Sequence, residues 1–285
     1  MIYNEDFMTG LERYNIENIK VTVTSPPYFD ARNYGGEALF ANQEDWIRWC
    51  FNGIVKIALR TRKDGVIWWN TGSGYKDYRK MIGVYKLVVA LDMNGIFLID
   101  EIPWVKKSAP PKKIRNRPHP AWEHNFIFAT HPSKVTFYRD NVRRPYAPAT
   151  LSRMKYKVGK LASDLDGEYP GGDKMVNPNP KGATPPNYLL LPQDTSRRPH
   201  PAPMVPDLAN WAIRAYSQEG DLVFDPMAGG GTTWVEAERL GREFIGFELF
   251  PEYIEMANMS IDRLRRGDDP YNGLRKEWEE AYAKI

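Results

Sequence analysis

Two loops of the sequence carry residues whose types and spacing could do chemistry. The first is Ser25-Pro26-Pro27-Tyr28, which follows a short β-branched run, Lys20–Thr24. Two adjacent prolines hold the backbone extended, so their carbonyl groups point in fixed directions and lack neighbouring N–H donors. A hydroxyl before the prolines and an aromatic ring after them form a small polar pocket with a stacking wall. Such a pocket suits a flat ring that carries an amino group.

The second loop is a glycine-rich turn, Asp225-Pro226-Met227-Ala228-Gly229-Gly230-Gly231-Thr232-Thr233, between a predicted strand and a predicted helix. Open α/β sheets bind ligands at this position, beyond the carboxyl ends of their strands. Glycines permit a tight turn and a close approach of the backbone to a ligand. The next predicted strand ends at Glu248, whose carboxylate can accept hydrogen bonds from ribose hydroxyl groups.

Three nucleotide-type ligands compete for this turn. A phosphate-binding P-loop needs a lysine after the glycines, and the turn has none. The dinucleotide fingerprint would place its third glycine at Trp234, which disfavours NAD. An acid that opens the loop and a second acid one strand later suit a nucleoside without phosphates. S-adenosylmethionine fits this chemistry; the alternative is a turn whose glycines serve packing alone.

The apolar periodicity around these loops predicts alternating strands and helices, and hence an α/β fold. The predicted strands are 20–24, 65–69, 96–105, 125–129, 221–224 and 243–247, and the predicted helices are 44–62, 80–93, 207–216, 232–240 and 251–265. Between His131 and about Pro185 the periodicity fades, and Gly, Pro, Asn and basic residues predominate. We expect an irregular insert there.

The composition excludes several classes of protein. With 42% hydrophobic residues the 285-residue chain can build a large core, and its one cysteine excludes a disulfide framework. No apolar run reaches about 18 residues, and the first residues do not resemble a signal peptide, so we expect a soluble, cytoplasmic protein. Between Trp104 and Pro199 basic residues outnumber acidic ones by eleven, whereas the rest carries a net charge of −8. This basic third indicates either a solvated insertion or a surface for a polyanion such as nucleic acid.

Taken together, the two loops resemble those of the amino-group DNA methyltransferases. Ser25-Pro26-Pro27-Tyr28 is similar to the catalytic motif of that family, and the turn from Asp225 to Thr233 is similar to its cofactor loop. A catalytic loop that precedes the cofactor loop is the order of the β-class. The resemblance implies a circularly permuted Rossmann-like methyltransferase sheet with a basic, Pro-rich target-recognition insert. Residues 1–130 would form the catalytic half, 131–195 the insert and 196–285 the cofactor-binding half.

The resemblance also implies a site for S-adenosylmethionine. The segment His200–Pro206 is similar to the one that precedes the cofactor loop in this class, and Asp6 lies in a segment similar to an early acidic turn that contacts the adenine. Met227, Gly230 and Met204 depart from the usual Phe, Ser and Lys of the family. The residues expected to bind the cofactor are Asp6, Thr24, His200, Pro201, Asp225, Pro226, Met227, Gly229, Gly231, Thr232, Thr233 and Glu248.

The activity implied by the resemblance is methyl transfer to an exocyclic amine of a flipped DNA base. The catalytic residues expected are Ser25, Pro26, Pro27 and Tyr28. The amine would donate hydrogen bonds to Ser25 Oγ and the Pro26 carbonyl while Tyr28 stacks on the base, so no covalent intermediate is needed. A serine at the first position is associated with N4 of cytosine in this family, and aspartate with N6 of adenine. Ser25 therefore favours cytosine; an N6-adenine enzyme, an RNA methyltransferase and a silent DNA-binding protein are the alternatives.

Double-stranded DNA is the expected partner. A basic loop from Lys106 to Arg117 is expected to meet the DNA backbone, and arginines and lysines of the insert are the candidates for base reading. The residues expected to contact DNA are Arg32, Tyr34, Lys112, Lys113, Arg115, Arg117, Arg143, Arg144, Lys155 and Lys157. A cognate restriction endonuclease and a homodimer are further expectations, and no membrane partner is expected.

The remaining reactive residues favour structural roles. Cys50 lies on an apolar helical face, where a core thiol is expected rather than the nucleophile of a carbon-5 methyltransferase. His119 and His124 are not spaced as metal ligands, so no metal is expected. Ser73 lacks the Gly-x-Ser-x-Gly frame of a serine hydrolase.

Overall fold

The structure, a computed structural model, describes residues 1–29, 39–109, 114, 116–154, 178–194, 196 and 198–282. The chain divides into two compact units. The larger unit joins Met1–Phe137 to Asn187–Ile285, and the smaller unit is Tyr138–Pro186. The smaller unit falls within the range 131–195 that the sequence assigns to a target-recognition insert.

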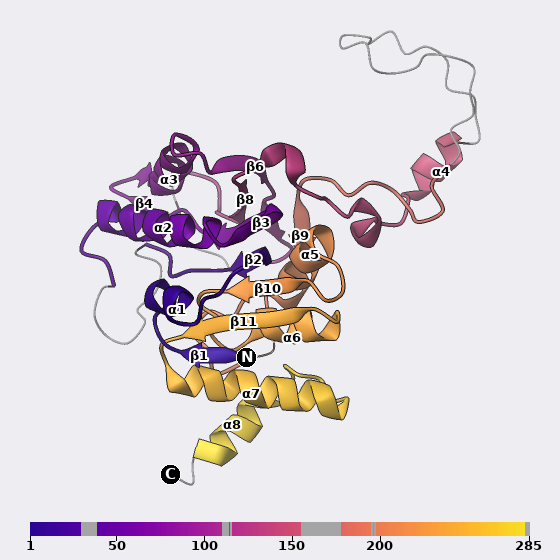
Figure 1. The fold of residues 1–285 in the computed structure, drawn as a ribbon. Coiled ribbons are helices and arrows are strands. Elements are labelled where there is room, and N and C mark those ends of the chain that lie inside the picture. The colour runs from indigo at the N-terminus through magenta and orange to yellow at the C-terminus, as the bar shows by residue number, and fades with distance from the viewer. Residues whose placement is uncertain are drawn as a thin grey trace. The chain divides into compact units, whose positions relative to one another are not determined.

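A nine-stranded sheet forms the centre of the larger unit (Figure 1). Its strands are β1 (Ile2–Asn4), β2 (Ile19–Thr24), β3 (Thr61–Thr71), β6 (Phe97–Glu101), β7 (Trp104–Lys106), β8 (Trp122–Ala129), β9 (Leu189–Leu191), β10 (Leu222–Asp225) and β11 (Glu243–Glu248). The order is β1-β11-β10-β2-β3-β8-β7-β9, and β6 also pairs with β8. In this order the neighbouring strands β1, β11, β10, β2 and β3 run parallel to one another. Strand β8 is antiparallel to β3, β6 and β7. The predicted α/β class is therefore confirmed.

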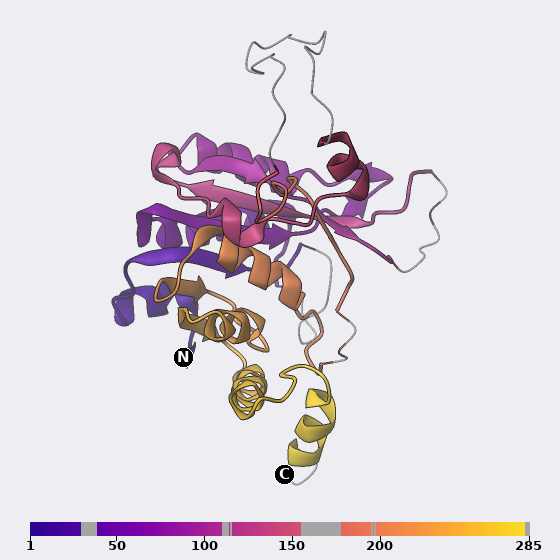
Figure 2. The same cartoon turned by 90° about the vertical axis from the view of Figure 1, so that its right-hand side faces the viewer.

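Helices cover both faces of this sheet. On one face α1 (Phe7–Arg13), α2 (Gln43–Ala58) and α3 (Gly83–Asp92) pack against β11, β3 and β6. On the other face α5 (Pro206–Tyr216), α6 (Thr232–Arg239) and α7 (Pro251–Arg266) pack against β2, β10 and β11. Figure 2 shows α5 and α6, in orange, in front of the strands. The last helix, α8 (Leu274–Tyr282), packs against α7.

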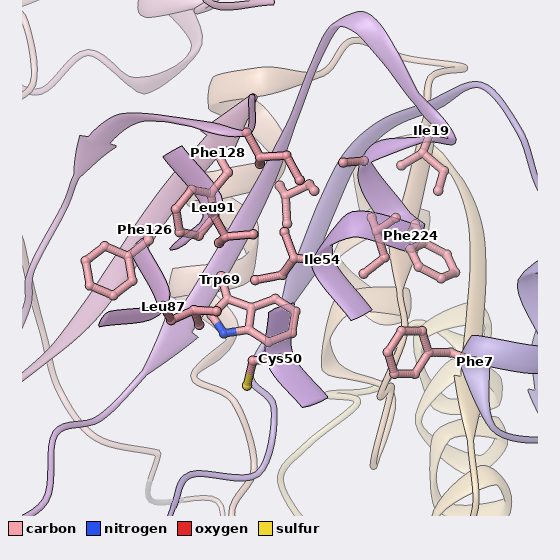
Figure 3. Close-up of a cluster of buried hydrophobic side chains, with 14 of the residues drawn as sticks. Phe7, Ile19, Cys50, Ile54, Trp69, Leu87, Leu91, Phe126, Phe128 and Phe224 are labelled. Carbon is pink, nitrogen blue, oxygen red and sulfur yellow. The ribbon is translucent and has the colours of Figure 1, made fainter. Parts of the chain in front are cut away.

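The main core lies between the sheet and α1–α3 (Figure 3). Trp69 and Phe126 from β3 and β8 are almost fully buried, and Ile54 of α2 packs into the same cluster. Cys50 is fully buried there, and burial raises the pKa of its thiol well above the usual range. The predicted role of Cys50 as a core side chain agrees with this position.

Several predicted elements differ from the structure at their ends. The helix predicted over 44–62 ends at Ala58, and Thr61 instead begins β3 by pairing with Ile19 of β2. The helix predicted over 80–93 begins at Gly83, because residues 79–80 form β5 (Arg79–Lys80) of a hairpin with β4 (Tyr75–Lys76). The strand predicted over 96–105 breaks at Ile102–Pro103 into β6 and β7, since proline cannot donate to a sheet. The elements β1, β9, α1 and α8 are present in the structure but are not predicted from the sequence.

The smaller unit contains two short helical segments within its described residues. They are the 3₁₀ turn η2 (Arg139–Val142) and α4 (Pro148–Met154). An antiparallel bridge pairs Arg144 with Ala183, and the Asp140 carboxylate accepts hydrogen bonds from Arg143 at 2.6 Å and Lys181 at 3.0 Å. In the larger unit a similar 3₁₀ turn, η1, covers Pro132–Lys134. Within the part of the chain that the structure describes, no helix is long and apolar enough to cross a membrane.

The packing of α6 on α7 should depend most strongly on Gly231 among the glycines. Its φ is +80°, and an added Cβ would lie 2.5 Å from the Ala257 Cβ of α7. We expect Gly231→Ala to lower the free energy of unfolding by about 3 kcal/mol, because the left-handed backbone and the overpacking both cost energy. Gly267→Ala is the matched control, since its φ is +83° but nothing lies within 4 Å of its Cβ. That control should lose only about 1–2 kcal/mol, and equal losses in urea unfolding would contradict the packing argument.

Candidate functional site

The functional residues gather where four parallel strands end. β10, β2 and β3 are neighbours in the sheet, and β11 lies beside β10. Their carboxyl ends deliver Asp225 from β10, Ser25 just after β2, Asn70 from β3 and Glu248 from β11. The loops predicted to do chemistry are therefore brought together although 200 residues separate Ser25 from Asp225. This is the edge at which open α/β sheets bind ligands.

A cavity of about 420 Å³ opens at this edge. Its lining is acidic and aromatic, and it comprises Glu5, Asp6, Phe7, Ser25, Pro27, Leu39, Phe40, Asp45, Trp49, His200, Ala202, Pro226, Met227, Gly229, Glu248, Leu249, Phe250 and Tyr253. Four of these side chains are carboxylates, and none of the described lining residues is a lysine or an arginine. The cavity therefore favours a ligand that combines a flat apolar ring, hydroxyl donors and positive charge.

Two buried carboxyl groups stand at the base of the glycine turn. Complete burial raises the pKa of Asp225 to about 7, although Thr233 Oγ1 donates to it at 2.7 Å and the Met227 N–H at 3.1 Å. Burial also raises the pKa of Glu248, whose carboxyl accepts the N–H groups of Gly229 at 2.8 Å and Phe250 at 3.0 Å. Glu248 thus holds the glycine turn and at the same time lines the large cavity.

Hydrogen bonds and a close ring contact hold the Ser-Pro-Pro-Tyr loop in place. The indole N–H of Trp46 donates to the Pro27 carbonyl at 2.9 Å. The ring of Tyr28 lies against Gly72, where an added Cβ would meet it at 2.9 Å. The Tyr28 hydroxyl lies 2.7 Å from Asn70 Oδ1 and 2.8 Å from Glu123 Oε2, and its single proton can be donated to one of these acceptors at a time. Ser25 Oγ lies 3.2 Å from the same hydroxyl.

A buried series of amides decides which atom of Asn70 faces Ser25. The indole N–H of Trp68 can only donate, and it donates to Asn125 Oδ1 at 3.0 Å. Asn125 Nδ2 then donates to the Ile102 carbonyl at 2.8 Å, and Asn70 Nδ2 donates to Asn125 Oδ1 at 3.0 Å. Asn70 Oδ1 is left to accept the Ser25 hydroxyl at 3.0 Å. With its proton committed to Asn70, the Ser25 oxygen presents lone pairs to a donor in the cavity.

A second, more polar cavity of about 140 Å³ shares Ser25 and Ala202 with the large one. Its lining residues are Ser25, Tyr28, Asn70, Trp104, Lys106, Glu123, Gln193, Asp194, Ala202, Pro203, Met204, Val205 and Leu208. The Lys106 ammonium donates to Glu123 Oε1 at 2.6 Å, and both side chains are more than four-fifths buried. The arrangement offers room for one planar ring beside the Ser25 hydroxyl.

The residues predicted to bind a cofactor fall into two groups. Those that line the large cavity are Asp6, His200, Pro226, Met227, Gly229 and Glu248. Asp225, Thr232 and Thr233 line a smaller cavity of about 40 Å³ that also touches His200, Met227 and Gly229. Thr24, Pro201 and Gly231 line neither: Thr24 is buried at the end of β2, Pro201 is exposed, and Gly231 packs on α7. The packing of Gly231 on Ala257 gives this glycine a structural reason that the sequence does not reveal.

Of the residues predicted to contact DNA, the structure describes only three. The Arg117 guanidinium lies 3.9 Å from the ring centroid of Tyr75 in the hairpin. In the smaller unit Arg144 is exposed, whereas Arg143 binds Asp140 and the Gly182 carbonyl at 2.9 Å. The others, Arg32, Tyr34, Lys112, Lys113, Arg115, Lys155 and Lys157, lie outside the described residues. Lys106, expected at the DNA backbone with its neighbours, instead pairs with Glu123 in the wall of the small cavity.

Most of the cavity walls consist of residues that the sequence does not mark as functional. Trp49 lies in the helix predicted over 44–62 from apolar periodicity, yet it lines the large cavity together with Phe40. Phe250 and Tyr253 follow Glu248 closely, and an aromatic residue two positions after a strand-end acid is a signal that sequence could have used. Asn70 also carries a signal that the sequence could have provided, because it directly follows the strand predicted over 65–69, which belongs to β3 beside β2.

A serine, a histidine and a glutamate form a hydrogen-bonded series near the Ser-Pro-Pro-Tyr loop. Ser73 Oγ lies 2.7 Å from His124 Nε2, and His124 Nδ1 lies 2.5 Å from Glu101 Oε1. Burial lowers the pKa of the His124 ring despite the nearby carboxylate. Among the described residues, the cavity that touches Ser73 measures about 10 Å³ and does not include His124. The series therefore braces the turn after β3.

Comparison with known proteins gives a consistent family. The sequence model of the DNA methylase family N6_N4_Mtase matches residues 19–259. The Type II methyltransferase M.XycI of Xanthomonas campestris pv. cyanopsidis is 26% identical over 297 residues, which cover 93% of this chain and 87% of M.XycI.

Two solved structures share the fold. The PvuII DNA methyltransferase, described as cytosine-N4-specific, aligns with a TM-score of 0.67 and 22% identity over 90% of this chain and 84% of its own. The M1.HpyAVI–SAM complex aligns with a TM-score of 0.55 and 20% identity over 90% of this chain and 98% of its own.

Burial of Asp225 should make the stability of the protein depend on pH. Its folded pKa of about 7 lies above that of an unfolded aspartate, so its contribution is full below about pH 4 and is lost as pH rises through about 7. Asp225→Asn cannot ionise. We therefore expect the free energy of unfolding of wild type to fall relative to that of Asp225→Asn between about pH 4 and about pH 7. Urea unfolding of both proteins across this range measures the difference, and a difference that does not change with pH would contradict the assignment.

Proposed function

Because the chain belongs to the N6_N4_Mtase family of DNA methylases, we propose that it methylates the exocyclic N4 amine of a cytosine flipped out of duplex DNA. As a member of that family the chain is a DNA methyltransferase with S-adenosylmethionine as its cofactor; the base and the amino group are the finer part of the proposal. The observation that carries it is the position of Ser25, which lines both the acidic large cavity and the small polar one.

The large cavity suits S-adenosylmethionine by its donor set. Glu248 stands at the end of β11, where its carboxylate can accept hydrogen bonds from ribose hydroxyl groups, and Asp6 caps α1 with its side chain at the cavity wall. Phe250 and Met227 supply apolar surface for an adenine ring. The carboxylates of the lining favour a cation, since no lysine or arginine among the described lining residues opposes it. When bound, S-adenosylmethionine supplies an electrophilic methyl group on a cationic sulfur.

The Ser25 loop prepares the amine of the base. An exocyclic amine is a poor nucleophile because its lone pair is delocalised into the ring. Ser25 Oγ accepts one N–H of the amine, since the Ser25 proton is held by Asn70 Oδ1 at 3.0 Å. The Pro26 carbonyl accepts the other N–H. These two acceptors draw the nitrogen toward a pyramidal geometry and aim its lone pair at the large cavity, so that catalysis rests on positioning and electrostatics.

The small cavity receives the ring of the base. Base-modifying enzymes take the target out of the stack because its reacting atom is inaccessible in the duplex. Tyr28 and Trp104 provide aromatic walls, and Met204, Val205 and Leu208 provide apolar ones. A neutral serine at the first position of the loop supports cytosine, and the cytosine-N4-specific PvuII enzyme shares the fold. Arg144, which is exposed in the smaller unit, is a candidate for reading the bases of the recognition sequence.

Nucleoside analysis tests the proposed target directly. The protein is incubated with S-adenosylmethionine and unmodified duplex DNA, the DNA is digested, and methylated nucleosides are identified by mass spectrometry. We expect N4-methylcytosine. N6-methyladenine would contradict the choice of base, and label in RNA but not in DNA would contradict the substrate. Sequencing of the methylated DNA then gives the recognition sequence, for which a cognate endonuclease is the expected partner.

Ser25→Ala separates the role of the hydroxyl from cofactor binding. The variant loses the acceptor for the amine, so we expect the single-turnover rate of methyl transfer to fall about a hundredfold. The dissociation constant for S-adenosylmethionine, measured by calorimetry, should stay within about twofold of the wild-type value. The substitution removes an acceptor for the amine of the base and no hydrogen bond to the cofactor. Glu248→Gln is the converse control, with weaker cofactor binding expected. A rate for Ser25→Ala near that of wild type would contradict the proposed role.

A further inference from the structure

Lys106 is a cation in the wall of the small cavity whose hydrogen-bonding capacity is only partly used. It ends β7, and 16% of its side chain is exposed. The ammonium donates to Glu123 Oε1 at 2.6 Å and lies 5.1 Å from the ring centroid of Trp104. An ammonium has three N–H donors, and the described residues supply one hydrogen-bond acceptor for it. The remaining N–H groups are available to an acceptor on a ligand in the cavity that Lys106 lines.

Glu123 ties this cation to the catalytic loop. Its Oε1 accepts from Lys106, and its Oε2 accepts from the Tyr28 hydroxyl at 2.8 Å. The Tyr28 hydroxyl in turn lies 3.2 Å from Ser25 Oγ. A short series of contacts therefore fixes the ammonium relative to the atom that receives the amine. Lys106 stands in the same small cavity as Ser25, where the ring attached to that amine must lie.

The two amino-bearing bases differ in what they offer to such a donor. When the amines and the adjacent ring nitrogens of cytosine and adenine are superposed, cytosine places its O2 carbonyl where adenine has a C2–H group. A carbonyl oxygen accepts a hydrogen bond from an ammonium, whereas a C–H leaves the ammonium unpaired. Gln193 also lines the cavity, but its amide can present either a donor or an acceptor and so could accommodate either base. The Lys106 ammonium can only donate, and it therefore distinguishes the O2 carbonyl of cytosine from the C2–H group of adenine.

We propose that Lys106 donates a hydrogen bond to the O2 carbonyl of the flipped base and so selects cytosine over adenine. This inference rests on the proposed function. It assigns the choice of base to a residue on β7, outside both loops that the sequence marks as chemical. Ser25 holds the amine that the two bases share, and Lys106 recognises the group that they do not share.

The test compares two bases at one position. Two duplexes carry the recognition sequence, with either cytosine or adenine at the target position and an abasic site opposite, so that neither target base has a Watson–Crick partner. Single-turnover methyl transfer is measured on both, and the ratio of the cytosine rate to the adenine rate is compared between proteins. Wild type should prefer cytosine. In Lys106→Met, which keeps the length of the side chain but no donor, this ratio should fall about ten- to a hundredfold, chiefly through the cytosine rate.

Two further variants make the result specific. Lys106→Arg restores a cationic donor and should recover most of the ratio. Lys107→Met removes the neighbouring exposed charge and should leave the ratio unchanged, since Lys107 lines neither cavity. Cofactor affinity measured by calorimetry reports that each variant is folded. A ratio that is unchanged in Lys106→Met, whether or not both rates fall, would overturn the inference. A wild-type preference for adenine would instead overturn the proposed target base, before any variant is compared.

Discussion

The geometry of the site depends on one hydrogen bond that can run in only one direction. The indole N–H of Trp68 is a donor without acceptor capacity, and it is buried in the sheet where it meets Asn125 Oδ1. That contact sets the orientation of two amides in succession and leaves Asn70 Oδ1 as the acceptor for Ser25. A side chain in the core thereby determines where the Ser25 proton points. Because both amides are fully or almost fully buried, reversing either would place donors against donors at a cost of kilocalories.

The order of the strands turns this local arrangement into a site with two compartments. Since β2 lies between β10 and β3, the Ser25 loop stands between the glycine turn and the end of β3. The carboxylates and aromatic rings gather on the side of β10 and β11, and the Lys106–Glu123 pair on the side of β7 and β8. Ser25 belongs to both compartments. A methyl donor and a methyl acceptor of opposite chemical character can thus meet at one hydroxyl group, and the protein need not form a covalent bond to either.

The sequence predicts the two loops well, because a turn at the end of a strand carries its chemistry in consecutive residues. Ser25 with its prolines and Asp225 with its glycines could be found in this way, as could the acid Glu248 one strand later. The cavity walls could not, because Trp49, Lys106 and Glu123 come from elements whose pairing is set by the tertiary fold. Lys106 shows the difficulty most clearly. In sequence it belongs to a basic run, whereas a two-residue pairing of β7 with β8 turns it toward Glu123. Gly231 also has a role that the sequence does not reveal, since this glycine of the predicted cofactor turn packs against Ala257 of α7.

The measurement that tests this account most directly is the methyl-transfer rate of Asn70→Ala on duplex DNA. The substitution removes the acceptor that holds the Ser25 proton but leaves every residue of the large cavity in place. We expect the single-turnover rate constant to fall at least about tenfold, because a serine hydroxyl that is free to rotate no longer presents its lone pair to the amine. The dissociation constant for S-adenosylmethionine should remain within about twofold of wild type. A transfer rate equal to that of wild type would show that the orientation of Ser25 does not control catalysis.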